Sequence, residues 1–129
     1  MSHPIAGLMR SSIVHVAFAF VAMGSWAAFA NRAHPMPAPL QAGLIQGALS
    51  AVITLLLKRG IEALSRRFNG IAALLAPPVI AGLASASLLT VIHSVGGTPE
   101  IGRTIAVPLT VATSYAALYN FSLWRSRKA

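Results

Sequence analysis

The chain has 129 residues, of which 56% are hydrophobic and only 9% are charged, against about 25% charged in an ordinary soluble domain. So few charges cannot cover a soluble surface, which excludes a soluble globular protein. Ten Lys and Arg outnumber two Asp and Glu, for a formal charge of +8. These charges form short patches between apolar runs, unlike the continuous basic face of a nucleic-acid-binding protein. The expected partners are therefore membrane lipids with anionic headgroups, and no nucleic acid.

Four apolar stretches predict an all-α membrane protein. The hydrocarbon core of a bilayer is near 30 Å thick, so a spanning helix needs about 20 apolar residues. Four stretches without a formal charge reach this length, at residues 11–30, 38–57, 71–95 and 104–124. Basic residues, Pro and Gly separate them. We therefore expect a single domain over residues 1–129 with four transmembrane helices.

The basic residues between these stretches predict the orientation, because Lys and Arg near helix ends are retained in the cytoplasm. Counted over alternating segments, one side has only Arg32 and Arg103. We therefore expect both termini in the cytoplasm. The other side has eight basic residues: Arg10, Lys58, Arg59, Arg66, Arg67, Arg125, Arg127 and Lys128.

The first apolar stretch has a second interpretation. Arg10, the apolar run at 13–23 and the triplet Ala28-Phe29-Ala30 resemble a signal peptide with its cleavage site. The apolar run is also long enough to span a membrane, and we expect it to be retained as the first helix.

The second helix is expected to continue beyond the membrane to about residue 68. Ile61, Leu64 and Phe68 recur at helical spacing, with Glu62 on the opposite side. Such an amphipathic segment can lie on the headgroups or contact a partner protein. Asn69-Gly70 is then expected to end this helix.

Small residues on the second helix predict its packing face. Gly43, Gly47, Ser50 and Thr54 fall on one stripe at spacings of four, three and four, and Gln46 borders it. Gly43-x-x-x-Gly47 matches the motif for close helix contact in membranes. Packing within one chain is the simpler interpretation, and the seam of a homodimer is the alternative.

No Asp, Glu, Lys or Arg lies within a predicted span, whereas ion-coupled transport generally needs such a group. The titratable candidates that remain are His15 and His93, which can respond to pH near neutrality but are equally explained by hydration or hydrogen bonding near a membrane surface. They are expected near opposite faces, so no shared metal site is predicted. Cysteine is absent, which excludes thiolate ligands, and no cofactor is expected.

Catalysis finds no support in the sequence. Both acids lie outside the spans, and no paired carboxylates or glycine-rich phosphate loop occurs. Pro77-Pro78 and Pro108 remove backbone donors and can bend helices. Pro108 is expected in the first turn of its helix, where Pro is tolerated. We expect a protein that is not an enzyme.

The ends of the second and fourth helices can be overlaid as a weak repeat. Thr54 then matches Asn120, and Arg59 matches Arg125. Parallel repeats of this kind occur in transporters.

At Asn120-Phe121-x-x-x-Arg125 the chain resembles the GtrA-like family of small four-helix membrane proteins, and its length and topology are similar as well. The first half has Thr54-Leu55 where that family has Asn-Phe. The resemblance implies help in moving polyprenyl-phosphate-linked sugars across a bacterial inner membrane. It would make Asn120 and Arg125 candidate contacts for the lipid phosphate or for interhelical hydrogen bonding. Thr54 and Arg59, their counterparts in the weak repeat, and Gln46, which borders the polar stripe, are further substrate-binding candidates.

Two functions of different classes follow. The first is a transport-type protein, flippase-like and possibly homo-oligomeric, that handles a lipid-linked sugar or another amphipathic substrate. The alternative is a non-catalytic accessory subunit that scaffolds a larger membrane protein. A channel ranks last, because charged rings and a recognisable filter are absent.

Overall fold

The computed structural model describes the backbone of residues 4–128 and the side chains of residues 12–127. The chain forms four helices and no other regular element over that range, which confirms the expected all-α fold. The helices are α1 (Pro4–Ala30), α2 (Ala38–Ser65), α3 (Ile71–Val95) and α4 (Ile101–Lys128). Arg10 and Lys128 contribute to the predicted orientation, and their side chains lie outside the described residues.

Three of these helices are long and apolar enough to cross a membrane, over Ser12–Ala30, Ala38–Ser65 and Ile71–Val95. α4 has 28 residues and therefore a length of roughly 42 Å. Its hydroxyl, amide and phenol side chains make it more polar than the other three. Length and composition therefore assign three spans among the described residues.

Proline and glycine set the breaks between helices. Pro37 precedes α2, and Gly97, which ends the turn after α3, has a φ of 72° that side-chain-bearing residues rarely adopt. Gly70, with a φ of 61°, is the residue before α3 and does not end α2, which stops at Ser65. The expected helical extension to residue 68 is therefore three residues shorter, and Ile61 within it is fully buried and cannot lie on headgroups.

α4 begins at Ile101, so Pro108 is its eighth residue and lies inside the helix. The expectation that Pro108 occupies the first turn was wrong. The helix starts earlier than the apolar stretch because the backbone N–H of Thr104 already bonds to the Glu100 carbonyl, at 2.9 Å.

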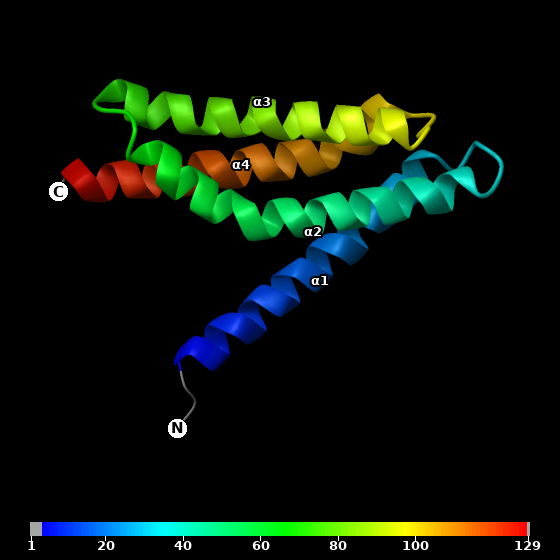
Figure 1. Cartoon of the computed structure of the whole chain (residues 1–129), viewed down its shortest axis with the longest axis horizontal. Helices are drawn as coiled ribbons and strands as arrows, with labels where there is room; N and C mark the ends of the chain where they lie inside the picture. The colour runs from blue at the N-terminus through cyan, green and yellow to red at the C-terminus, as the bar shows by residue number, and fades with distance from the viewer. Residues whose placement is uncertain (1–3, 129) are drawn as a thin grey trace.

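Helices α2, α3 and α4 run side by side, whereas α1 crosses α2 and diverges from the bundle toward its N-terminus (Figure 1). The crossing is made by glycine. A Cβ on Gly24 would stand 2.9 Å from the Gly43 carbonyl oxygen, and one on Gly47 would stand 3.0 Å from the Phe20 carbonyl oxygen. The glycine face of α2 therefore packs on α1 of the same chain.

The bundle buries several polar side chains and exposes many large apolar ones. Gln46, His93 and Asn120 are fully buried, while large apolar side chains such as Phe18 and Leu118 are 71% exposed. A soluble protein buries its large apolar groups. The opposite arrangement is expected in lipid, where polar side chains find partners inside the bundle.

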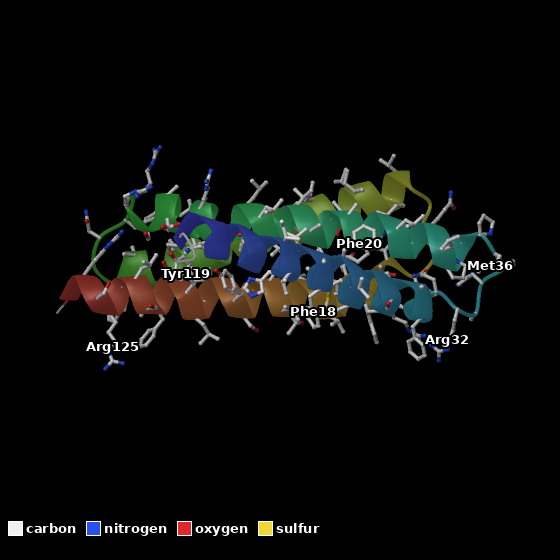
Figure 2. All side chains as sticks on the ribbon, turned by 90° about the horizontal axis from the view of Figure 1, so that it is seen from below. Phe18, Phe20, Arg32, Met36, Tyr119 and Arg125 are labelled. Carbon is white, nitrogen blue, oxygen red and sulfur yellow. The ribbon has the colours of Figure 1, made fainter. Side chains whose placement is uncertain are left out.

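The two ends of the bundle differ in charge. Arg32 and Arg103 lie at the end that holds the α1–α2 and α3–α4 loops, which we call the loop end. The opposite end, which we call the basic end, holds the α2–α3 loop and the C-terminus (Figure 1), and Figure 2 shows Arg125 and Arg32 at the two extremes. The described basic-end residues are Lys58, Arg59, Arg66, Arg67, Arg125 and Arg127.

Candidate functional site

The divergence of α1 leaves an open cleft between α1, α2 and α4, with a volume of about 930 Å³. This volume is within the range of small-molecule sites. Its apolar walls come from side chains of all three helices, such as Val16, Leu56 and Val111. Pro108 lines it as well, where the proline has no N–H to offer to the Thr104 carbonyl.

The cleft becomes polar and basic toward the basic end. Lys58 and Arg59 of α2 face Tyr115 and Tyr119 of α4, and His15 of α1 completes the lining there. The Lys58 ammonium stands 5.9 Å from the centre of the Tyr119 ring, within range of a cation–π contact, and the two tyrosine rings stack at 5.8 Å. The cleft thus has an apolar interior and a cationic, aromatic mouth.

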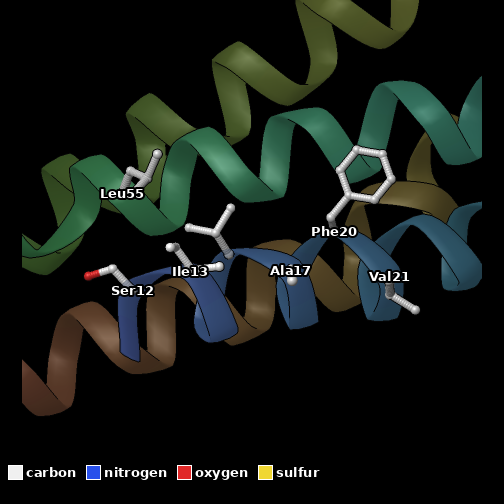
Figure 3. A pocket seen from close by; sticks show the side chains of 7 residues that line it. Ser12, Ile13, Ala17, Phe20, Val21 and Leu55 are labelled. Carbon is white, nitrogen blue, oxygen red and sulfur yellow. The ribbon is translucent and has the colours of Figure 1, made fainter. Parts of the chain in front are cut away.

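A second hollow, of about 530 Å³, lies between α1 and α2 on another face of α1 and has an apolar lining (Figure 3). Ile13, Ala17 and Val21 of α1 line it with Leu55 of α2, and the Phe20 ring closes one end of it in the figure. Residues 12–19 of α1 are therefore flanked by open space on two faces.

The cleft brings together four of the residues proposed from sequence. Thr54, Arg59, His15 and Ser50 all line it, although they come from two helices. Lys58, Tyr115 and Tyr119 were missed. The signal was present, because Thr54 and Lys58, like Tyr115 and Tyr119, are four residues apart and share one helix face. Ser12 lines the cleft as well.

Asn120 and Arg125 do not line the cleft. Asn120 is fully buried, and its amide donates to the carbonyls of Ala73 at 2.9 Å and Leu74 at 2.8 Å. Arg125 is exposed and points outward at the basic end (Figure 2). Thr54, which overlays on Asn120 in the weak repeat, is exposed to the cleft, so the two positions have different environments.

Gln46 and His93 form a separate buried cluster near the loop end. The Gln46 amide donates to Ser50 Oγ at 2.8 Å, so Gln46 Oε1 accepts from His93 Nε2, also at 2.8 Å. In the neutral imidazole His93 Nδ1 then accepts from the Thr98 hydroxyl at 2.7 Å. His93 is consequently a bonded core residue that joins α2 to the α3–α4 loop.

A second cluster at the loop end was not anticipated. Asn31 donates to Thr104 Oγ1 at 2.7 Å and accepts from the backbone N–H of Glu100 at 2.9 Å. His34 donates to Glu100 Oε2 at 2.8 Å, and Trp26 Nε1 donates to the Arg103 carbonyl at 2.9 Å. These bonds tie the end of α1 to the start of α4. One indication of this cluster was present in the sequence: Asn31, His34 and Glu100 lie in turns that are predicted at the same face of the membrane.

At the basic end α4 holds the neighbouring helix termini. Arg127 donates to the Ser65 carbonyl at 2.6 Å and to Ser65 Oγ at 3.0 Å, at the C-terminus of α2. Trp124 Nε1 donates to the Gly70 carbonyl at 3.0 Å, directly before α3. A cation at a helix C-terminus is favourable because it neutralises the exposed carbonyls.

Comparisons with protein families, with curated proteins and with solved structures find no match. Among the residues that the structure describes, no group of three His, Asp or Glu side chains is placed to hold a metal ion.

Proposed function

We propose that the protein binds an amphipathic substrate in the cleft between α1, α2 and α4 and assists its movement across a membrane. The cleft is the observation that carries this proposal. Its apolar walls suit a hydrocarbon chain, and Lys58 with Tyr119 at its mouth suits a polar or anionic head. The proposed role is non-enzymatic.

The proposed topology has four spans, including α4, with both termini in the cytoplasm of a bacterium. α4 lies beside α3 along its length (Figure 1). The Asn120 amide donates to two carbonyls of α3, so these polar groups are bonded within the bundle and do not face lipid. The basic end supports the cytoplasmic assignment. Under this topology the cleft opens near the cytoplasmic surface, where an amphiphile enters with its head at Lys58.

The GtrA-like resemblance supports the same class of substrate but points to different residues. It assigns the lipid phosphate to Asn120 and Arg125, whereas the cleft assigns the polar head to Lys58, with Thr54 and Tyr119 beside it. We propose the cleft residues, because the Asn120 amide is already bonded to backbone and Arg125 points away.

Native mass spectrometry in mild detergent with lipids retained tests this assignment. The wild-type chain is expected to carry an amphiphile, and Lys58→Gln is expected to lower the lipid-bound fraction several-fold. Arg125→Gln is the matched control, since it removes one exposed positive charge from the same end without touching the cleft. If Arg125→Gln loses the lipid and Lys58→Gln keeps it, the family-based assignment is right and the cleft is not the site.

Movement of the substrate is a separate step with its own assay. Proteoliposomes with fluorescently labelled phosphatidylglycerol are expected to expose inner-leaflet label to an external quencher faster than empty liposomes do. Binding without faster exposure would favour the accessory-subunit alternative. That alternative rests on the Gly43/Gly47 face, which packs on α1 here, and on the basic loop between α2 and α3, so a partner would contact that loop. It predicts stoichiometric co-purification with a larger membrane protein.

A further inference from the structure

The described side chains of helix α1 are hydrogen-bonded to other helices at one end only. At the loop end Trp26 bonds to the Arg103 carbonyl and Asn31 bonds to Thr104. Toward the basic end, none of the described side chains from residue 12 to residue 25 hydrogen-bonds to another helix. Among the described side chains, the hydrogen bonds that join this region to α4 therefore lie at Trp26 and at Asn31, directly after α1.

The crossing between these two parts is made of backbone and glycine. Gly24 lies against Gly43, and the carbonyl and ring of Phe20 lie against Gly47 at 3.0–3.1 Å from a Cβ placed there. These contacts contain no side-chain hydrogen bond that a rotation would break. Glycine within a helix also lowers the cost of a local bend. The crossing thus has the properties of a pivot.

Beyond this pivot, residues 12–19 of α1 are flanked by the 930 Å³ cleft and the 530 Å³ hollow. Val14 and Phe18 are 62% and 71% exposed. Figure 3 shows Ser12, Ile13 and Ala17 on one side of this segment with open space before Leu55. A helix segment with space on both sides can swing without displacing a neighbouring helix.

We propose that residues 12–19 form a hinged arm that pivots at Phe20–Gly24 and closes over the cleft onto α4. Ala19 of the arm and Ala112 of α4 line opposite walls, and small residues allow two helices to approach closely in a membrane. Closing moves Val16 toward Val111 and encloses whatever lies between them. The identity of the substrate that the arm covers rests on the proposed function, whereas the motion itself requires no substrate.

Open and closed positions are both populated under this proposal. Apolar contacts between helices gain little in lipid, because the lipid chains they replace are equally apolar. The described side chains of the arm make no hydrogen bond to another helix in the open position, so closing breaks none. The expected behaviour is an exchange between two discrete positions.

Pulsed electron–electron spin resonance in nanodiscs of phosphatidylethanolamine and phosphatidylglycerol tests the arm directly. The native chain lacks cysteine, so labels attach only at introduced sites. Val14→Cys with Leu118→Cys places labels on exposed positions of α1 and α4 outside the cleft lining. This pair is expected to give two distance populations.

The control pair reports the same two helices at the bonded end. Ser25→Cys with Gly102→Cys is expected to give one narrow distance, because the Asn31–Thr104 bond holds α1 and α4 together there. A single narrow distance from both pairs would overturn the arm. If the arm is overturned but lipid is retained in the mass spectra, the proposed function still stands. If two distances are found but no lipid is retained, the arm stands and the proposed function does not.

Discussion

The side-chain amide of Asn120 stands in for the backbone donor that Pro78 lacks. In an α-helix the N–H of residue 78 would bond to the Leu74 carbonyl, and that of residue 77 to the Ala73 carbonyl. Both residues are proline, and Asn120 Nδ2 donates to both carbonyls, at 2.8 and 2.9 Å. A residue of α4 thus completes the hydrogen bonding of α3. Asn120 Oδ1 is buried without a partner, so the contact depends on the amide hydrogens alone.

Asn120→Ala is therefore expected to destabilise the protein by about 1–3 kcal/mol, because it leaves the buried Ala73 carbonyl and the part-buried Leu74 carbonyl without donors. Unfolding of the purified protein in detergent, followed by tryptophan fluorescence, measures the loss. The same substitution in a Pro77→Ala, Pro78→Ala background is expected to cost much less, since the restored N–H groups then satisfy Ala73 and Leu74. Equal costs in both backgrounds would contradict this role of Asn120.

The Gln46–His93 bond is expected to behave as a coupled pair. Gln46→Leu leaves His93 Nε2 without its acceptor inside the bundle, and His93→Leu leaves Gln46 Oε1 without its donor. Each single substitution is expected to cost about 1–2 kcal/mol, and the double substitution less than the sum of the two. Ser87→Ala is the control, because that exposed hydroxyl bonds only within its own helix. Additive losses would mean that the pair contributes nothing as a unit.

Acid is expected to loosen the loop end through Glu100. Its hydrogen bond from His34 holds the pKa of Glu100 below the ordinary value of 4.5, and the charges of His34 and Arg103 act in the same direction. A carboxyl group with a lowered folded-state pKa stabilises the fold fully above its unfolded-state pKa, and this stabilisation is lost as the pH falls through the folded-state value. Thermal stability is therefore expected to fall as the pH drops below about 4.5.

The two acids of the chain provide the test. Glu100→Gln is expected to remove this part of the acid dependence, and Glu62→Gln, at the basic end, is expected to retain it. Melting temperatures at several pH values between about 5 and 3 distinguish the variants. An unchanged acid profile in Glu100→Gln would show that the His34 contact is not the source.

Gly24→Ala is expected to separate α1 from α2. The added Cβ would meet the Gly43 carbonyl oxygen at 2.9 Å, and backbone cannot move aside as a flexible side chain can. The expected loss is about 1–3 kcal/mol of stability, measured by detergent unfolding. Gly60→Ala is the matched control within a helix, since nothing lies within 4 Å of its Cβ position; it should be neutral or gain up to about 1 kcal/mol. A neutral Gly24→Ala would show that the crossing has slack.

Sequence alone determined that the chain is helical, how many helices it has and which end of the bundle is basic. These properties depend on short segments: an apolar run forms a helix in lipid because its backbone must bond internally, and Pro or Gly ends it locally. The boundaries that the sequence did not predict also depend on local contacts. The start of α4 at Ile101 and the place of Pro108 inside it depend on the Glu100–Thr104 bond, which the hydropathy pattern does not contain.

Only the tertiary structure decided what the polar residues do. A helical side chain turns by about 100° with each residue, so its partner depends on how each helix is rotated and crossed against the others. Asn120 and Thr54 look equivalent along the chain, yet one bonds to α3 and the other faces the cleft. The cleft itself exists because α1 crosses α2 at Gly24 and then diverges. The angle at which α1 crosses α2 depends on how the two helices pack together, so it cannot be read from the sequence of either helix alone.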